Sequence, residues 1–282
     1  MYFIFGGGFM KKVMAPCIEC FKETGIPNFN FVIQEQNDEC VYSFKCDKGH
    51  EFILIQQIQR FELKFDMACF SYINDDYSAA VMYCASALER FREFFVQAVW
   101  LNNDCEEGTS SYEKYWKKVK SRSENQLGTF YAVYFSKFGD LNDAIEHEVK
   151  FTQSDVEFRN NVVHKGFYAN RERTFAYLEK TYKYISVLLK YLNARYAEGI
   201  RKAISYNIET NVNEYKKSCN KKVCSSTITE YHVISLSDLE NIENPKPLLD
   251  RINTYIDMTN KVNSMITNKP SDFVERIIQH NK

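Results

Sequence analysis

Apolar side chains recur every three or four residues through most of the chain beyond residue 56, which is the spacing of one buried face of an α-helix. The longest such stripe follows Asn74, Asp75 and Asp76, whose polar side chains can cap a helix, and it predicts a helix that runs to about Leu101. The pattern therefore predicts a mainly α fold with a helical bundle as its largest part. Further helices are predicted over residues 56–73, 112–122, 126–138, 141–150, 152–163 and 171–197, with a polar loop over residues 102–111.

The two ends of the chain follow other patterns. Residues 30–33, 41–44 and 52–55 carry the β-branched and aromatic side chains of short paired strands. Near the other end, Thr229 to Leu236 alternates enough to predict a strand, and helices are predicted from Leu248 and Ser271. We therefore expect a small β region at the N-terminus and a mostly helical C-terminal extension.

Composition supports a helical globular protein, because 10 Gly and 5 Pro leave few helix breakers in 282 residues. Hydrophobic residues make up 45% and charged residues 26%, which excludes disordered and fibrous classes. Lys and Arg number 36 against 37 Asp and Glu, so the net charge is -1. No strong overall field attracts nucleic acid, and any contact with RNA must be a local patch.

One local patch of this kind is predicted in the helix over residues 112–122. Its aromatic side chains, Tyr112, Tyr115 and Trp116, lie between cations and could stack on bases while the cations contact phosphates. Surface lysines around a buried tryptophan would give the same pattern. The cations are Lys114, Lys117, Lys118, Lys120 and Arg122.

Cysteine usage indicates a reducing compartment. The nine cysteines are an odd number, and no apolar segment with a small-residue cleavage site precedes them, which argues against secretion and disulfides. No apolar run reaches the roughly 18 residues of a membrane span. We therefore expect a cytoplasmic protein with no membrane contact.

Two knuckles near the N-terminus predict a metal site. Cys17 and Cys20 form a Cys-x2-Cys pair, and Cys46 and His50 lie around Gly49. The first turn supplies two thiolates, and the second supplies one thiolate and one imidazole. Together they make a tetrahedral Cys3His set for zinc. The predicted strands between the knuckles resemble the layout of a zinc ribbon, although the second knuckle departs from Cys-x2-Cys.

All four positions around the metal would be filled by protein ligands, so we expect the zinc to hold structure and not to catalyse. Cys40 is a further thiol that could replace Cys46 or His50. The alternative interpretation is a group of buried, reduced cysteines. Such a module can recognise nucleic acid or a partner protein, and the sequence does not choose between them.

Candidate catalytic residues lie between Phe158 and Gly166. On a helix His164 lies about 140° around the axis from Arg159 and roughly 7.5 Å along it. Asn160 is four residues before His164 on the same face, so its amide can orient the imidazole. The long side chain of Arg159 can bend toward the same place. Guanidinium, amide and imidazole could then surround one phosphate-sized anion.

The helices over residues 60–197, with Arg159, Asn160 and His164 near the end of one of them, resemble the HEPN superfamily. The resemblance implies a metal-independent ribonuclease in which two subunits pair and two copies of the Arg-x4-His motif form one cleft. It also implies a role as a toxin or antiviral-defence effector. Some HEPN proteins lack activity, so a silent module that binds nucleic acid or protein, as the partner of a separate nuclease or sensor, is the alternative.

The chemistry can also be argued from the residues. RNA carries its own nucleophile, the 2′-hydroxyl, so its cleavage needs a base, an acid and positive charge at the phosphate. His164 can exchange a proton near neutrality, and Arg159 can stabilise charge on the phosphate by on the order of 3 kcal/mol. A homodimer would supply a second His164 for the other proton transfer. The products would be a 2′,3′-cyclic phosphate and a 5′-hydroxyl.

These expectations divide the chain into a zinc-ribbon-like domain over residues 1–56, a HEPN-like bundle over residues 57–197 and a helical extension over residues 198–282. A supporting role for Glu89 near the active site is a minor possibility beside a solvated, ion-paired one. The expected partners are RNA, with transfer RNA as a candidate substrate, a second copy of the chain, and an inhibitor or sensor protein.

Overall fold

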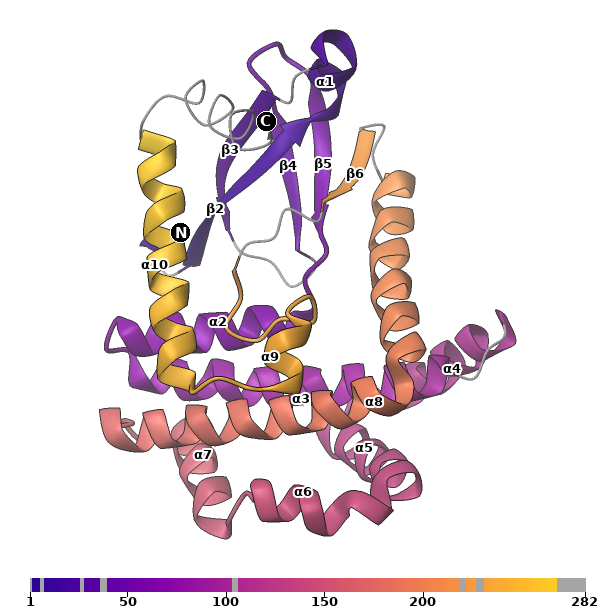
Figure 1. Ribbon diagram of the computed structural model, residues 1–282, viewed down its shortest axis with the longest axis vertical. Coiled ribbons are helices and arrows are strands. Elements are labelled where there is room, and N and C mark those ends of the chain that lie inside the picture. Colours follow the sequence, from indigo (N-terminus) through magenta and orange to yellow (C-terminus); the bar gives the residue numbers. More distant parts are fainter. Residues whose placement is uncertain are drawn as a thin grey trace. The chain divides into compact units, whose positions relative to one another are not determined.

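The computed structural model describes residues 2–5, 8–25, 28–35, 40–102, 106–218, 222–226 and 231–267 (Figure 1). The chain divides into two compact units. We call residues 1–58, 207–231 and 253–282 the sheet unit, and residues 59–206 and 232–252 the helical unit. Residues 198–282, which we expected to form one extension, are divided between these two units.

The sheet unit contains two three-stranded sheets. The first has the antiparallel order β1-β2-β3, and the second joins the antiparallel hairpin β4-β5 to β6, which runs parallel to β5. The predicted strands lie within β3, β4 and β5, whereas β1, β2 and β6 add to the small β region that we expected. The bounds are β1 Tyr2–Phe5, β2 Gly8–Cys17, α1 Ile18–Thr24, β3 Asn28–Glu35, β4 Val41–Lys45, β5 Glu51–Gln56 and β6 Lys222–Ser226.

The β4-β5 hairpin is buried on both faces. Tyr42 and Leu54, which are register partners, pack in one cluster with Cys17, Cys20 and Cys46 of the two knuckles. Val41 and Ile55 lie on the opposite face, against side chains that include Val212 of the helix α8. Burial on both faces explains why the apolar run of β5 is nearly continuous and does not alternate.

The helical unit is built around two long adjacent helices, α2 and α3, which lie side by side (Figure 1). Phe61 of α2 packs against Phe91 and Phe94 of α3 with ring centroids 5.4 and 5.3 Å apart. The ends of α8 and α10 continue into the sheet unit. The bounds are α2 Arg60–Ile73, α3 Tyr77–Leu101, α4 Glu106–Val119, α5 Ser123–Phe138, the 3-10 turn η1 Gly139–Leu141, α6 Asn142–Glu148, α7 Gln153–Lys165, α8 Arg171–Ser218, α9 Leu239–Glu243 and α10 Leu248–Thr267.

Capping residues set several of these helix ends, and the sequence predicts the cap of α3. The Asp76 side chain accepts from the backbone N–H of Ala79 at 3.1 Å, which starts α3. Thr152 and Asp155 form a reciprocal capping box at the start of α7. Gly166 ends α7 in the left-handed conformation, with φ 69°. The helix that carries the candidate catalytic residues is therefore bounded at both ends by local sequence.

One predicted boundary is wrong, and another falls at a kink within a longer helix. Residues 102–111 are not all loop, because α4 begins at Glu106, and Trp100 donates a hydrogen bond to Ser111 at 3.0 Å. The end predicted at Ala197 coincides with a break, because the backbone of Tyr196 is non-helical, and α8 continues beyond this kink to Ser218. Gly199 lies within the continued part, where an added Cβ would lie 2.0 Å from the Ala98 carbonyl oxygen. The glycine permits close packing on α3 and does not end the helix.

The strand predicted over residues 229–236 is wrong for its described part, residues 231–236, which form a loop. Side chains, not a neighbouring strand, satisfy its backbone. Asp66 accepts from the Val233 N–H at 2.9 Å, and Glu62 accepts from the Leu236 N–H at 2.6 Å. Arg251 donates to the carbonyl oxygens of Val233 and His232. Residues 229, 230 and the helix predicted from Ser271 lie outside the described residues.

These side chains form a buried charged network. Glu62, Asp66 and Arg251 are all less than 4% exposed. Asp66 contacts the His232 Nδ1 atom at 2.6 Å, and Arg251 pairs with Asp238 at 2.6 Å. Burial raises the pKa of Glu62 to about 7, although the His232 charge and two backbone N–H groups oppose this shift. The network fastens the loop to α2 through groups that are costly to leave unpaired.

The mainly α class is confirmed, with a β region in the sheet unit. The HEPN arrangement of the helices stays a prediction. None of the described helices combines the length and the apolar content that are needed to cross a membrane.

We expect Arg251→Met to lower the free energy of unfolding by about 3–5 kcal/mol, because it leaves Asp238 and two loop carbonyls without their donor. Urea denaturation of the full chain measures this. Arg201→Met is the control, because the Arg201 side chain is 69% exposed beside Glu198 and should contribute little. Equal urea concentrations at the midpoint of unfolding for the two variants would show that the network does not hold the loop.

Candidate functional site

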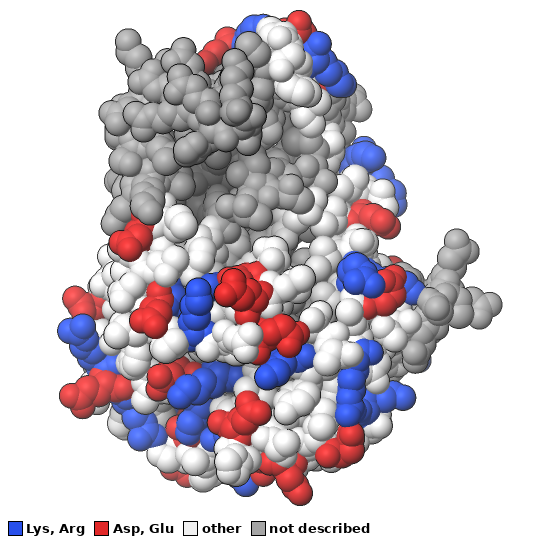
Figure 2. Space-filling model, in the orientation of Figure 1, with Lys and Arg blue, Asp and Glu red and all other residues white. Residues whose placement is uncertain are grey.

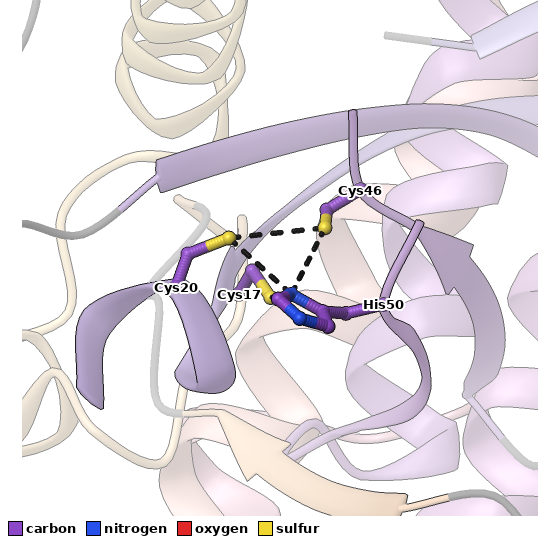
Figure 3. A group of neighbouring side chains, drawn as sticks. All are labelled: Cys17, Cys20, Cys46 and His50. Carbon is purple, nitrogen blue, oxygen red and sulfur yellow. Dashed lines mark hydrogen bonds between the residues drawn. The ribbon is translucent and has the colours of Figure 1, made fainter. Parts of the chain in front are cut away.

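The two knuckles of the sheet unit bring their four side chains together (Figure 3). Cys17 is the last residue of β2, and Cys20 lies in the first turn of α1. Cys46 follows β4 and His50 precedes β5, in a tight turn where the Gly49 N–H donates to the Cys46 carbonyl at 2.8 Å. The four ligand atoms lie within 4.8 Å of one another. These residues are positioned as a possible metal site.

The separations fit a tetrahedral zinc ion. Bonds of about 2.3 Å to sulfur and about 2.1 Å to nitrogen place two sulfurs about 3.8 Å apart and sulfur about 3.6 Å from nitrogen. The Sγ atoms of Cys20 and Cys46 are 3.8 Å apart. The His50 Nδ1 atom lies 3.5 Å from each of them and 3.7 Å from the Cys17 Sγ atom. The donor set therefore suits a metal ion, and these four separations are close to those of a tetrahedral zinc site.

Local electrostatics favour a metal-binding state of the cluster. Burial opposes ionisation of Cys46, but hydrogen bonds from the His50 and Lys48 backbone and from the Cys17 and Cys20 side chains lower its pKa to about 7. The other imidazole nitrogen of His50 lies 3.3 Å from a Glu23 carboxylate oxygen. A carboxylate in this position fixes the imidazole with Nδ1 toward the metal.

Cys40 is not part of the cluster. It is 2% exposed and precedes β4, and its side chain is outside the group formed by Cys17, Cys20, Cys46 and His50. Of the three ligand sets that the sequence leaves open, the structure brings together the one with both Cys46 and His50.

The three residues of the Arg-x4-His motif lie on α7 but have different surroundings. The Arg159 Nη1 atom donates to the Asn160 Oδ1 atom at 2.8 Å, and Arg159 also hydrogen-bonds Tyr177 of α8. Another guanidinium nitrogen of Arg159 lies 3.7 Å from the Glu89 carboxylate of α3. Glu89 is thus beside the motif, at the distance of a weak ion pair.

His164 is exposed near the C-terminus of α7, one helical turn beyond Asn160 on the same face. No hydrogen bond joins Asn160 to His164 in the described chain, and Asn160 is engaged by Arg159 instead. Within one chain, therefore, Asn160 orients the guanidinium and not the imidazole.

Arg159 and Asn160 line a cavity of about 440 Å³ inside the helical unit, and His164 does not line it. Arg92 of α3 and the tyrosines Tyr177 and Tyr184 of α8 line the same cavity. Sequence reasoning did not identify these three residues as part of a site. Arg92 lies at the polar edge of an apolar helix stripe, and an arginine in such a position is ordinarily interpreted as a surface residue.

The aromatic residues of the predicted basic patch do not form a stacking platform. Tyr112 and Trp116 are 3% and 8% exposed, and their rings stack on each other with centroids 5.8 Å apart. The interpretation as surface lysines around a buried tryptophan is therefore the better one for α4. In the view of Figure 2, Lys and Arg are interspersed with Asp and Glu over the coloured surface, and no broad area carries one sign of charge.

The chain matches no family model, no curated protein and no solved structure. Any function must therefore be proposed from the side chains and their geometry.

We expect the purified chain to hold about one zinc ion, and Cys46→Ser to release it and lower the melting temperature, because three ligands bind zinc more weakly than four. Metal analysis by mass spectrometry and thermal melting measure the two effects. Cys40→Ser is the matched control and should retain its zinc. Zinc loss in the control but not in Cys46→Ser would refute the ligand set.

Proposed function

We propose that the chain is a metal-independent endoribonuclease of the HEPN type that uses Arg159, Asn160 and His164. The observation that carries this proposal is the arrangement on α7, where Arg159 and Asn160 line a cavity and His164 lies one turn further along the same face. A cation for the phosphate and a titratable base are thus presented along one edge of the unit. These are the groups that cleavage by the 2′-hydroxyl requires.

Each residue has a separate role in the proposed reaction. Arg159 binds the phosphate that is attacked and stabilises the charge that develops on its oxygens. Asn160 holds the guanidinium in position through the 2.8 Å hydrogen bond. His164 takes the proton from the 2′-hydroxyl as the oxygen attacks phosphorus. The 5′-oxygen leaves with a proton from an acid, which gives a 2′,3′-cyclic phosphate and a 5′-hydroxyl.

We propose that the acid is His164 of a second copy. Exposed apolar side chains beside His164 support such an interface: Phe167 is 60% exposed and Tyr168 is 97% exposed. The next residue, Ala169, donates to the Ser78 hydroxyl of α3 at 3.2 Å, so this segment is held against α3. A two-fold pair formed here would bring two motifs into one cleft.

The biological role follows from the proposed activity. An RNA-cleaving cytoplasmic protein of this type would act as a toxin or antiviral-defence effector, with transfer RNA as a candidate substrate and an inhibitor or sensor protein as a regulator. The alternative is a catalytically silent HEPN module that binds nucleic acid or protein. The presence of an exposed His164 on the same helix as Arg159 favours the enzyme, because a binding module has no need of a histidine in this position.

We further propose that the metal in the sheet unit is zinc and that it is structural. Three sulfurs and one nitrogen would complete its coordination and leave no position for substrate or water. The metal would join β2, α1 and the β4-β5 hairpin. No step of the RNA cleavage uses it.

We expect His164→Ala to lower the rate of RNA cleavage by at least about 100-fold, because proton transfer loses its base. The assay follows total RNA and a labelled transfer-RNA pool over short times with EDTA present. It also tests whether the 3′ ends resist phosphatase until acid opens the cyclic phosphate.

His147→Ala is the matched control, because His147 is also exposed, on α6, and lies outside the motif. It should cleave like the wild type. If His164→Ala cleaves RNA as fast as the control, the proposed mechanism is wrong. If the wild type leaves all RNA intact, the silent binding module becomes the better explanation.

A further inference from the structure

The cavity beside Arg159 has the size of a ligand site and is formed by helices far apart in the sequence. Its volume of about 440 Å³ lies within the roughly 300–1,000 Å³ of small-molecule pockets. Side chains from α3, α5, α6, α7 and α8 line it, and all of them belong to the helical unit. Two guanidinium groups, Arg92 and Arg159, reach it from different helices.

The anionic side chains of the cavity already have cationic partners. Asp155 contacts the Lys180 ammonium at 2.6 Å, and Glu146 contacts the Lys150 ammonium at 3.0 Å. Neither carboxylate therefore has to neutralise an arginine.

Arg92 is the cation that lacks a counter-charge. It makes no salt bridge with any carboxylate of the described chain, and its buried Nε atom has no hydrogen-bond partner there. Its guanidinium lies over the Phe130 ring, 5.6 Å from the centroid, which fixes its position. A partly buried guanidinium with an unused donor favours an anion in the cavity.

Two phenols add further donors to the same space. Burial raises the pKa of Tyr184 to about 12 and also raises that of Tyr177, while the positive charges of the nearby arginines oppose both shifts. Both phenols therefore stay neutral and keep their O–H groups. Two guanidinium groups and two phenols suit an anion with several acceptor oxygens, which is a phosphate more than a carboxylate.

Exposed rings at the same cavity suit an aromatic group attached to the phosphate. Tyr131 and Phe135 of α5 line the cavity, although they are 43% and 55% exposed. Their rings stack on each other with centroids 6.1 Å apart. Exposed, mutually supported ring faces beside an anion site are what a nucleic-acid base stacks on.

We infer that the cavity binds one nucleotide unit of RNA, with its phosphate between Arg92 and Arg159 and its base on Tyr131 and Phe135. The inference rests on the proposed function for its RNA, and it adds Arg92 as a substrate-binding residue. The phosphate held between Arg92 and Arg159 is then the one that the proposed reaction attacks, and His164 lies about 6 Å further along α7 than Asn160.

Binding of adenosine 3′-monophosphate to the full chain tests this directly, by calorimetry and without any cleavage. Wild type and His164→Ala should bind it, and Arg92→Gln should weaken the binding at least tenfold, because a neutral amide replaces the charged guanidinium. Arg201→Gln, at an exposed arginine of α8, should bind like the wild type. Unchanged binding in Arg92→Gln, or none in the wild type, would overturn the inference.

A second variant tests the inference even if Arg92→Gln folds poorly. Tyr131→Ser alters a side chain that is 43% exposed, so it should leave the fold intact. It should weaken binding of adenosine 3′-monophosphate several-fold but leave binding of inorganic phosphate unchanged. Equal binding of the mononucleotide by wild type and Tyr131→Ser would contradict the base position.

The two proposals can fail separately. If the mononucleotide binds through Arg92 but RNA is not cleaved, the nucleotide site stands and the ribonuclease does not. If RNA is cleaved through His164 while Arg92→Gln keeps wild-type binding and KM, the ribonuclease stands and this inference falls.

Discussion

A charge that leaves water costs several kcal/mol unless a fixed partner meets it, and both units are built around this constraint. In the helical unit, Asp66 and Arg251 are almost fully buried and each is matched by backbone and charged groups. In the sheet unit, three buried thiols and an imidazole converge on one point, where a cation would stabilise the thiolates. Arg92 is different because its charge has no carboxylate partner among the described residues, which is why we place a ligand there.

Much of the fold could be predicted from periodicity and capping. The capping signal and apolar stripe from Asn74 predicted α3, and the pattern over residues 152–163 predicted α7, because both signals are local. The loop at 231–236 could not be predicted in this way. Its alternation suits a strand, but its backbone is satisfied by Glu62, Asp66 and Arg251 from other parts of the chain.

For the candidate sites too, local features could be predicted and contacts between distant segments could not. The Cys3His set could be predicted because each knuckle lies within a few residues, and only the choice between Cys40 and the other ligands needed the structure. The Arg-x4-His motif could be located, but its surroundings could not. Arg92 and Tyr177 meet Arg159 only through the packing of three helices, and no spacing in one sequence encodes that meeting.

The separation of Arg159 from His164 within one chain supports the central proposal, a cleft completed by a second copy. Adding inactive His164→Ala in excess to the wild type tests it most directly. Mixed dimers would contain only one His164 in the shared cleft and would lack either the base or the acid, so we expect RNA cleavage to fall below that of the same amount of wild type alone once subunits exchange. A mixture that exchanges subunits and keeps the full wild-type rate would contradict a site shared between two chains.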